Sequence, residues 1–430
     1  MIVWCEFVMM IKEMGKLNIW VIKEGEALPI RENARLMRTG MLAGYLSKKG
    51  HKVTWWSSTY IHAEKKYISG KMKTTKVNDN LRLVLLHSHL AYKKNMSLSR
   101  MAYHYILALQ FRKYCKKYRA PDVILCSWPT PQFAKAAVEY GCRAGIPVII
   151  DVRDQWPDIY YRVFPKMLQG VGKILIKPLQ ISARKTFHKA VSITGTVPSR
   201  VRWGCKYAGR NQGAYDRVIY IGNEEIGKIT EADINWWKDR GIDHTTWNLC
   251  FFSVFGKHIE IETVIEAVKK LSEEKLDIKL VIGGFGDREK ELKERAEGCS
   301  NIYFAGWLDK IQMNSLMSIS KCGVFSIKNT EDFRDTFNNK AIQYMAAGLP
   351  ILNSLSGFAK CLINEKGMGL TYLEGDVGDC QKKIRYLYEN EKMRKIMSVN
   401  AKRCFEEMFN GNVVNEKFEK LLLDVATKNA

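Results

Sequence analysis

Short apolar runs alternate along the chain with longer segments in which apolar residues recur at helical spacing. In the first half the apolar runs occupy residues 17–22, 52–56, 81–86, 122–127, 147–151 and 190–194. The helical segments between them include residues 31–49, 98–118 and 129–143. This alternation is typical of a parallel sheet wrapped by helices, whose strands are buried on both faces.

The second half repeats the alternation. Its apolar runs occupy residues 249–255, 279–284, 301–306, 322–327 and 349–354. Its helical segments occupy residues 261–274, 287–298 and 309–320, and residues 390–428 are predicted to be helical throughout. Two doubly wound, Rossmann-like α/β domains therefore follow one another, and ligands of such sheets bind beyond the carboxyl ends of the strands, here in a cleft where the domains face each other.

A length of 430 residues agrees with two domains. We expect an N-terminal extension at 1–16, a first domain at 17–222 and a second domain at 247–411. The polar stretch 223–246 lacks apolar periodicity and is predicted to be a linker. Residues 412–430 are predicted to form a C-terminal helix that packs back on the first domain.

The net charge of +23 is concentrated in the first half of the chain. Residues 1–215 contain 37 Lys and Arg against 12 Asp and Glu, which gives +25, whereas residues 216–430 contain 31 against 33, which gives −2. Two spans, 80–121 and 159–215, contain no acidic residue. Within the second, residues 162–180 interleave apolar residues with lysines, a pattern that favours contact with the anionic cytoplasmic leaflet of a membrane. For residues 98–118 a core helix with basic ends is favoured.

No stretch approaches the about 18 apolar residues of a membrane span. The eleven cysteines form no Cys-x-x-Cys pair, so neither a zinc ribbon nor a disulfide framework is indicated. These features predict a cytoplasmic protein, peripheral on the inner face of the plasma membrane. A nucleic-acid partner is not expected, because no recognition module is present and the basic residues flank apolar helices rather than stacking aromatics.

Groups suited to bind an anion follow the strands of the second half. Gly256 and Lys257 follow the run 249–255, where a backbone turn and an ammonium could hold phosphate. Gly284 ends the run 279–284 and Gly286 follows it; both would let the backbone approach a ligand closely, although a plain tight turn is the alternative. The polar loop before residue 341 adds further candidates.

The second half carries a resemblance in its successive segments FSVFGK, IETVIEAVKKL, LVIGGFGD, NIYFAGWLD and NNKAIQYMAAGLPIL. This order resembles the nucleotide-sugar half of family 4 retaining glycosyltransferases with the GT-B fold. In the first half, the stretch from GEALPIREN to TYIH, the segment PVIIDVRDQWPD and SRVRWGCKYAG resemble the acceptor domain of bacterial members that build surface polysaccharides. The resemblance covers about residues 17–410. It implies a nucleotide-sugar donor, a UDP-sugar by family habit, and a glycan or polyprenyl-diphosphate-linked acceptor.

The resemblance also implies roles for residues around 335–348. The family has two glutamates eight positions apart, the first binding donor sugar hydroxyls and the second the nucleotide ribose. Asp335 and Gln343 stand at these positions. The Gln343 amide oxygen can still accept a ribose hydrogen bond, but more weakly than a carboxylate, and the alternative is a polar helix position near solvent. We expect residues 346–348 to let the helix end abut the nucleotide.

Cationic side chains are expected to stabilise the leaving diphosphate, because the chain has no Asp-x-Asp motif and no metal cofactor is expected. Lys257 is the first candidate. The family has a second basic group a few residues later, where this loop offers only His258, so Lys340 or Arg334 is expected to substitute. Asn339 is a further donor-binding candidate. Retention of configuration would follow the front-face route that the resemblance implies.

On the acceptor side, Arg35 and Arg38 follow the first loop, where they could meet phosphate, with a solvated basic face as the alternative. The other acceptor-side candidates are Arg153, Asp154, Arg100 and His104. Arg153 and Asp154 either face a ligand or form an internal ion pair. Arg100 and His104 are helical i, i+4 neighbours that contact a substrate or have a local structural role. Two further functions stay open: a catalytically weak partner subunit and a sugar-nucleotide epimerase.

Overall fold

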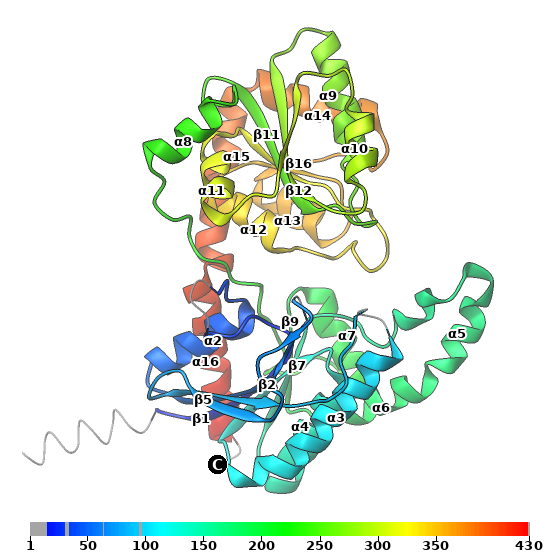
Figure 1. The fold of residues 1–430 in the computed structure, drawn as a ribbon, viewed down its shortest axis with the longest axis vertical. Coiled ribbons are helices and arrows are strands. Elements are labelled where there is room, and N and C mark those ends of the chain that lie inside the picture. The colour runs from blue at the N-terminus through cyan, green and yellow to red at the C-terminus, as the bar shows by residue number, and fades with distance from the viewer. Residues whose placement is uncertain (1–14, 31–33, 63, 94–96, 429–430) are drawn as a thin grey trace, which may run out of the picture. The chain divides into compact units, whose positions relative to one another are not determined.

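The computed structural model describes residues 15–30, 34–62, 64–93 and 97–428, which form two compact units (Figure 1). The first unit, here the first domain, comprises residues up to Tyr220 and those from Val414 onward, and the second domain is Ile221–Val413. Each is built on a mostly parallel sheet wrapped by helices, so the prediction of two Rossmann-like domains is confirmed. The expected extension, residues 1–16, lies almost entirely outside the described residues.

The first domain contains an eight-stranded sheet in the order β10-β9-β8-β7-β1-β2-β6-β5. All neighbours are parallel except β5, which runs antiparallel to β6 at the edge. The strands are β1 (Asn18–Ile22), β2 (Lys52–Ser58), β5 (Lys73–Lys76), β6 (Leu81–Leu86), β7 (Val123–Trp128), β8 (Val148–Val152), β9 (Ser192–Gly195) and β10 (Arg217–Val218). A separate hairpin pairs β3 (Tyr60–Ile61) with β4 (Lys66–Tyr67). Strand β1 is central and its apolar residues are buried on both faces, as its continuous apolar run predicts.

Two apolar cores cover the two faces of this sheet. One face packs against α3 (Leu98–Tyr114), α4 (Pro131–Ala144), α6 (Lys177–His188) and α7 (Pro198–Ala208). The other face packs against α2 (Arg38–Lys48) and the C-terminal helix α16 (Gly411–Lys428). In α16 the buried residues Val414, Phe418, Leu421, Leu422 and Val425 recur at helical spacing. A short helix, α5 (Gln169–Leu175), precedes α6.

The second domain contains a six-stranded parallel sheet in the order β13-β12-β11-β14-β15-β16. The strands are β11 (Trp247–Val254), β12 (Ile278–Phe285), β13 (Ile302–Gly306), β14 (Cys322–Phe325), β15 (Ile351–Asn353) and β16 (Gly369–Thr371). The helices are α8 (Glu231–Lys238), α9 (Glu262–Glu273), α10 (Glu289–Arg295), α11 (Lys310–Ile319), α12 (Asn339–Ala346), α13 (Phe358–Lys366), α14 (Val377–Glu389) and α15 (Glu391–Cys404).

The structure differs from the expected linker at 223–246. These residues belong to the second domain and include α8, whose N-terminus is closed by a capping box between Thr230 and Asp233. Trp237 is fully buried and donates its indole N–H to Ser315 Oγ at 3.0 Å. Within α8 a single buried tryptophan anchors the helix. One apolar residue does not produce a periodic pattern, so the sequence did not indicate this helix.

Three predicted helices also differ in detail. Of the segment predicted at 31–49, residues 34–37 are not helical, α2 begins at Arg38, and residues 31–33 lie outside the described residues. The segment predicted at 390–428 is interrupted by a π-helical turn at Phe405–Phe409. The helix predicted at 98–118 is α3, which ends at Tyr114 and packs on the sheet through Tyr103, Leu107 and Phe111, as expected for a core helix. Leu98 and Tyr105 are exposed on its other face.

No helix within the described residues is long and apolar enough to cross a membrane.

Candidate active site

The loop after β11 and the start of α12 lie at the same edge of the second sheet. Both follow the carboxyl ends of adjacent parallel strands, β11 and β14, and this edge is where open α/β sheets bind ligands. Gly256 and Lys257 belong to the β11 loop, and Lys257 is exposed to solvent. A Cβ on Gly256 would lie 3.0 Å from His258 Nδ1, so the glycine lets the imidazole fold back over the turn.

Lys340, in the first turn of α12, connects this helix to β11. Its Nζ donates a hydrogen bond to Ser253 Oγ at 2.5 Å and lies 5.9 Å from the Phe251 ring centroid. Among the described residues no carboxylate forms an ion pair with it. Burial lowers the pKa of Lys340 to about 8. Burial also lowers the pKa of His258, and the positive charge of Lys340 lowers it further. A partly buried ammonium without an anionic partner is suited to receive an anion.

The N-terminal end of α12 adds to this cationic environment. Asn338 caps the helix by accepting the Lys340 backbone N–H at 3.0 Å. The positive end of the helix dipole therefore lies beside the Lys340 ammonium. Asn339 opens the helix, and its carbonyl oxygen accepts from Asn223 at a long 3.5 Å.

The remaining predicted donor residues lie before and along α12. Asp335 is half-buried, and its Oδ1 accepts the backbone N–H of Phe358 at 3.3 Å. Arg334 is exposed. Gln343 is half-buried, one turn beyond Asn339. Asp335 and Gln343 thus lie on either side of the helix start, and their roles toward sugar and ribose stay predictions.

Gly284 in β12 and Gly286 just after it are required by the packing of the chain itself. Gly284 and Gly286 have φ values of +135° and +154°, which L side chains rarely adopt. A Cβ on Gly284 would lie 1.8 Å from the Ser253 carbonyl oxygen, and one on Gly286 would lie 2.7 Å from the Phe255 backbone nitrogen. Both glycines are required where β12 approaches the end of β11, and their contact with a ligand stays a prediction.

The small residues at 346–348 do not lie where the nucleotide was expected. A helix that follows β14 begins at the carboxyl edge of the sheet and ends at the opposite edge, where β15 starts. There Lys402 Nζ donates to the Ala346 carbonyl oxygen at 3.1 Å, and Ser398 Oγ donates to the Gly348 carbonyl oxygen. The expectation that this end abuts the nucleotide is wrong, because it packs on α15 and lines an open hollow of about 620 Å³ with it.

A network of ion pairs lies around the end of β8 in the first domain. The buried Asp151 accepts Arg38 Nε and Nη2 at 3.0 and 2.9 Å and Arg153 Nε at 3.0 Å. These guanidinium groups hold the pKa of Asp151 well below its usual range, although burial opposes the shift. Arg153 also donates to Glu26 and, at 2.9 Å, to Thr39 Oγ1.

This network shows what two of the predicted residues contact, and neither of the two alternatives stated for Arg38 holds. Arg38 is buried, also donates to the carbonyl oxygens of Ile219 and Tyr220, and lies 4.6 Å above the Phe418 ring. It is therefore a structural group that ties α16 and β8 together, and not the phosphate contact that was expected. Arg153 forms internal ion pairs with Asp151 and Glu26 instead of with Asp154.

A second buried group follows β1. Glu24 Oε1 accepts His104 Nε2 at 2.9 Å, and both side chains are 1% exposed. Burial lowers the pKa of His104. Burial would raise the pKa of Glu24, but the hydrogen bond from His104 and the positive charges of Lys23 and Arg100 outweigh it and lower this pKa to about 2. The pair is thus a carboxylate that accepts from a neutral imidazole.

Arg100 lies beside this pair. Its Nη2 is 3.8 Å from Glu24 Oε1, and its guanidinium lies 4.6 Å from the Trp156 ring and 5.2 Å from the Tyr92 ring. Asp154 caps the next turn by accepting the Gln155 backbone N–H at 2.8 Å and Trp156 Nε1 at 3.1 Å. Arg35 is exposed in the segment before α2, away from any described ion pair.

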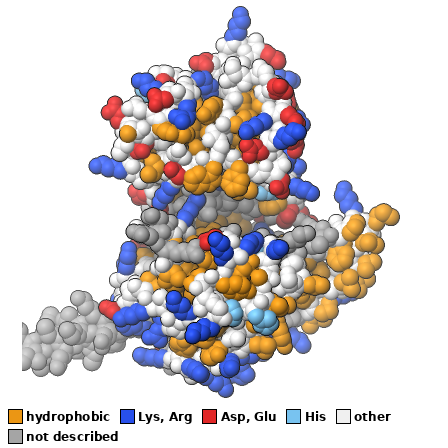
Figure 2. All heavy atoms as spheres, viewed as in Figure 1, with side chains coloured by type: hydrophobic (Ala, Val, Ile, Leu, Met, Phe, Trp, Pro, Cys, Tyr) orange, Lys and Arg blue, Asp and Glu red, His pale blue; other side chains and the backbone are white. Residues whose placement is uncertain are grey.

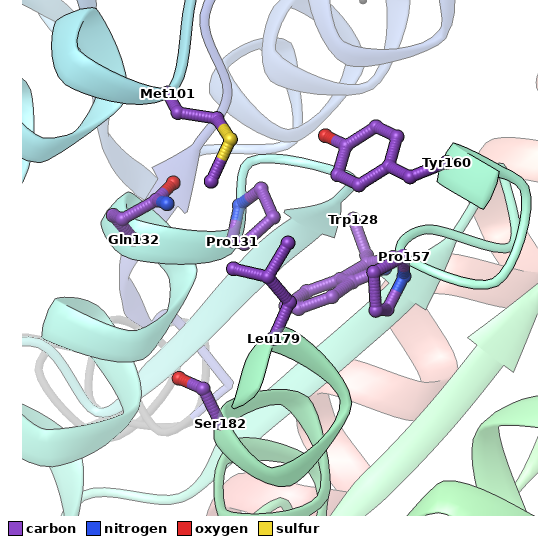
Figure 3. Close-up of a pocket in the computed structure, with 8 residues that line it drawn as sticks. All are labelled: Met101, Trp128, Pro131, Gln132, Pro157, Tyr160, Leu179 and Ser182. Carbon is purple, nitrogen blue, oxygen red and sulfur yellow. The ribbon is translucent and has the colours of Figure 1, made fainter. Parts of the chain in front are cut away.

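An apolar pocket of about 40 Å³ is lined by Met101, the residue that follows Arg100 in the chain (Figure 3). Its other walls are Trp128, Pro131, Gln132, Pro157, Tyr160, Leu179 and Ser182. Figure 3 shows Leu179 rising from α6 between Pro131 and Trp128, with the Tyr160 ring opposite. The pocket therefore joins α3, α4, α6 and the loop after β8, and it has room for a small apolar group.

Four groups of these networks were not predicted from the sequence. They are the buried carboxylates Glu24, Glu26 and Asp151, and the hydroxyl of Ser253. One signal was present, because Glu24 and Asp151 lie at or just after the carboxyl ends of predicted strands. Within the described residues, no group of three or more His, Cys, Asp and Glu side chains is arranged to hold a metal ion.

Comparison with known proteins finds similarity to glycosyltransferases. Residues 234–404 match the family model described as "Glycosyl transferases group 1". An uncharacterized glycosyltransferase of Methanocaldococcus jannaschii is 27% identical over 210 residues, and the match spans about half of each protein, 47% of this chain and 51% of the relative.

Solved structures match nearly the whole chain. Sucrose-phosphate synthase from Thermosynechococcus elongatus matches with a TM-score of 0.69 at 13% identity, covering 95% of this chain and 99% of that one. HepE of Anabaena, in complex with UDP, matches with a TM-score of 0.65 at 15% identity, covering 95% and 100%. At these identities the structures show a shared fold.

The architecture is thus that of the GT-B glycosyltransferases, and the second domain carries the group 1 match. Residues 234–404, which lie in the second domain, are similar to the group 1 glycosyl transferases, and the whole chain shares the fold of the solved structures.

Proposed function

We propose that the protein is a retaining, metal-independent glycosyltransferase of family 4 that moves a sugar from a UDP-sugar to a lipid-linked or polysaccharide acceptor in bacterial cell-surface glycan synthesis. The observation that carries the donor assignment is Lys340, a partly buried ammonium beside Ser253 with no described carboxylate partner. A diphosphate would supply the missing anion. The UDP complex of the structural neighbour HepE supports uridine as the base.

In this proposal the chain's own groups stabilise the leaving diphosphate. Lys340, the N-terminal end of α12 and the exposed Lys257 provide positive charge at the same sheet edge. Such preorganised groups act most strongly where negative charge develops, here on the phosphate oxygen released from the sugar. The bond from the sugar anomeric carbon to that oxygen breaks as the acceptor oxygen bonds to the same face. The leaving oxygen then takes the acceptor proton, so no separate catalytic carboxylate is needed.

The first domain is proposed to hold the acceptor. Arg100 contacts Glu24 and precedes Met101, which lines the apolar pocket of Figure 3, so a phosphate could meet its guanidinium while an apolar group enters the pocket. This combination of cation and apolar wall suits a polyprenyl diphosphate better than a free sugar. We place the reaction at the cytoplasmic face of the membrane, where such lipids are accessible.

The donor assignment is tested by thermal shift with a panel of nucleotide sugars, with and without EDTA. A UDP-sugar should raise the Tm in proportion to occupancy, and EDTA should not change the shift. A Tm that responds only when magnesium is present would overturn metal independence, and no response to any donor would overturn the donor site.

Gln343 favours a second candidate, a catalytically weak partner subunit that binds the donor without efficient turnover. A neutral amide replaces the family's second glutamate, so ribose would be held by a weaker hydrogen bond. Turnover separates this subunit from an enzyme. Donor consumption without any acceptor would instead indicate an epimerase.

A further inference from the structure

The first domain exposes an apolar ridge on α5 and on the turn before it. Met167 is 96% exposed and Ile174 is 61% exposed, and Val171 and Leu175 are exposed as well. Positions 167, 171, 174 and 175 follow helical spacing, so these side chains share one face. Figure 1 shows α5 projecting from its domain, and Figure 2 shows hydrophobic side chains gathered along that projection.

The opposite side of α5 is packed, which determines the direction of the ridge. A Cβ on Gly172 would lie 2.6 Å from the Phe164 ring, so the helix backbone rests directly on that ring. Ile176, at the end of α5, is 5% exposed. The exposed apolar face is therefore held outward by the packing of the inner face.

Lysines flank the ridge, and acidic residues are absent. Lys166, Lys173 and Lys177 are exposed; Lys173 lies on α5, Lys166 in the turn before it and Lys177 at the start of α6. No Asp or Glu occurs from residue 159 to 215.

The exposed large apolar side chains of the whole first domain are concentrated in the spans that contain no acidic residue. Among the described residues of the first domain, eleven of the thirteen exposed large apolar side chains fall in the two acid-free spans, 80–121 and 159–215. Exposed apolar surface and uncompensated positive charge therefore occur together. Leu98 and Tyr105 of α3 belong to this set, and Met101 and Leu179 join α3 to α6 at the apolar pocket.

We propose that this ridge, Met167–Leu175 with its flanking lysines, inserts into the headgroup region of an anionic lipid bilayer. A convex helix with apolar residues on one side and lysines beside them has the form of an interfacial membrane helix. Anionic headgroups match its charge. A second copy of the chain would bring the same positive charge against the ridge, which disfavours self-association. The docking does not depend on the identity of the donor.

The test is flotation of the full-length protein with vesicles of phosphatidylcholine alone or mixed with phosphatidylglycerol. The protein should float with the mixed vesicles and be released as salt rises, because screening weakens the lysine contribution. Ile174→Ser should weaken binding about tenfold through lost apolar burial. Lys177→Glu should weaken it by at least about fivefold through lost attraction.

A matched control is Ile311→Ser on α11 of the second domain, where the side chain is 58% exposed. This variant should float like the unchanged protein. Equal flotation with neutral vesicles, or unchanged flotation of Ile174→Ser, would overturn the proposal. A concentration-dependent dimer that Ile174→Ser abolishes would also overturn it and would assign the ridge to a second copy. A UDP-induced Tm shift, measured on the same samples, separates failure of docking from failure of the donor site.

Discussion

Replacement of Lys340 by Met removes the ammonium at the start of α12 while keeping an unbranched side chain of similar length. The ammonium forms one hydrogen bond within the described residues, to Ser253 Oγ at 2.5 Å. Losing a neutral-acceptor bond costs about 1 kcal/mol, and removing a partly buried charge offsets this cost. The Tm of the free protein should therefore change by only a few degrees at most, or rise.

The effect on ligand binding should be much larger. A hydrogen bond between an ammonium and a phosphate contributes about 1.5–3 kcal/mol, so the Kd for UDP should rise about 10- to 150-fold. Isothermal titration with UDP measures this change directly. Lys360→Met, at an exposed position on α13, is the control and should bind UDP normally.

The pH dependence gives a second readout for the same residue. The pKa of Lys340 in the free protein is about 8, and a bound diphosphate would raise it. Well below pH 8 the lysine is protonated in both states, so it contributes no pH dependence to UDP affinity there. Above pH 8 the free protein must take up a proton to bind, so affinity should fall until the bound-state pKa is reached. A Lys340→Met protein with unchanged UDP affinity and an unchanged pH profile would refute the assignment of this lysine to the diphosphate.

Three further predictions concern other groups. Lys257→Ala should lower kcat by about 10²–10³ with an unchanged Tm because the side chain is exposed, and a fully active variant in a sugar-transfer assay would exclude its role. Arg38→Met should destabilise the protein by about 3–5 kcal/mol in urea unfolding because it leaves the buried Asp151 without its bidentate partner, and adding Asp151→Asn should recover part of that loss. Burial lowers the pKa of His104, so below pH 6.5 the unfolded chain binds more protons than the folded protein and the folded protein loses stability. The lowered pKa of Glu24 adds a further loss of stability from about pH 4.5 toward pH 2. His104→Gln should flatten the fall in Tm between pH 7 and pH 5, and an identical slope would show that this pair does not titrate as described.

The amino-acid sequence by itself determined the alternation of strands and helices and the concentration of charge in the first half. A strand buried on both faces needs a continuous apolar run, and this requirement acts on neighbouring residues. For this reason the runs at 17–22 and 147–151 correspond closely to β1 and β8. Local polar composition was less informative, since residues 223–246 form part of the second domain and bury Trp237 and Ile242 there.

Only the tertiary structure decided which polar groups meet. Arg38 and Asp151 are 113 residues apart, and Glu24 and His104 are 80 apart, so their pairing depends on strand order and helix placement. The same is true of Lys340 and Ser253, which meet because β11 and β14 are adjacent strands. Periodicity defines an apolar face along one segment, but contact between distant side chains is created only when the sheet brings their segments together.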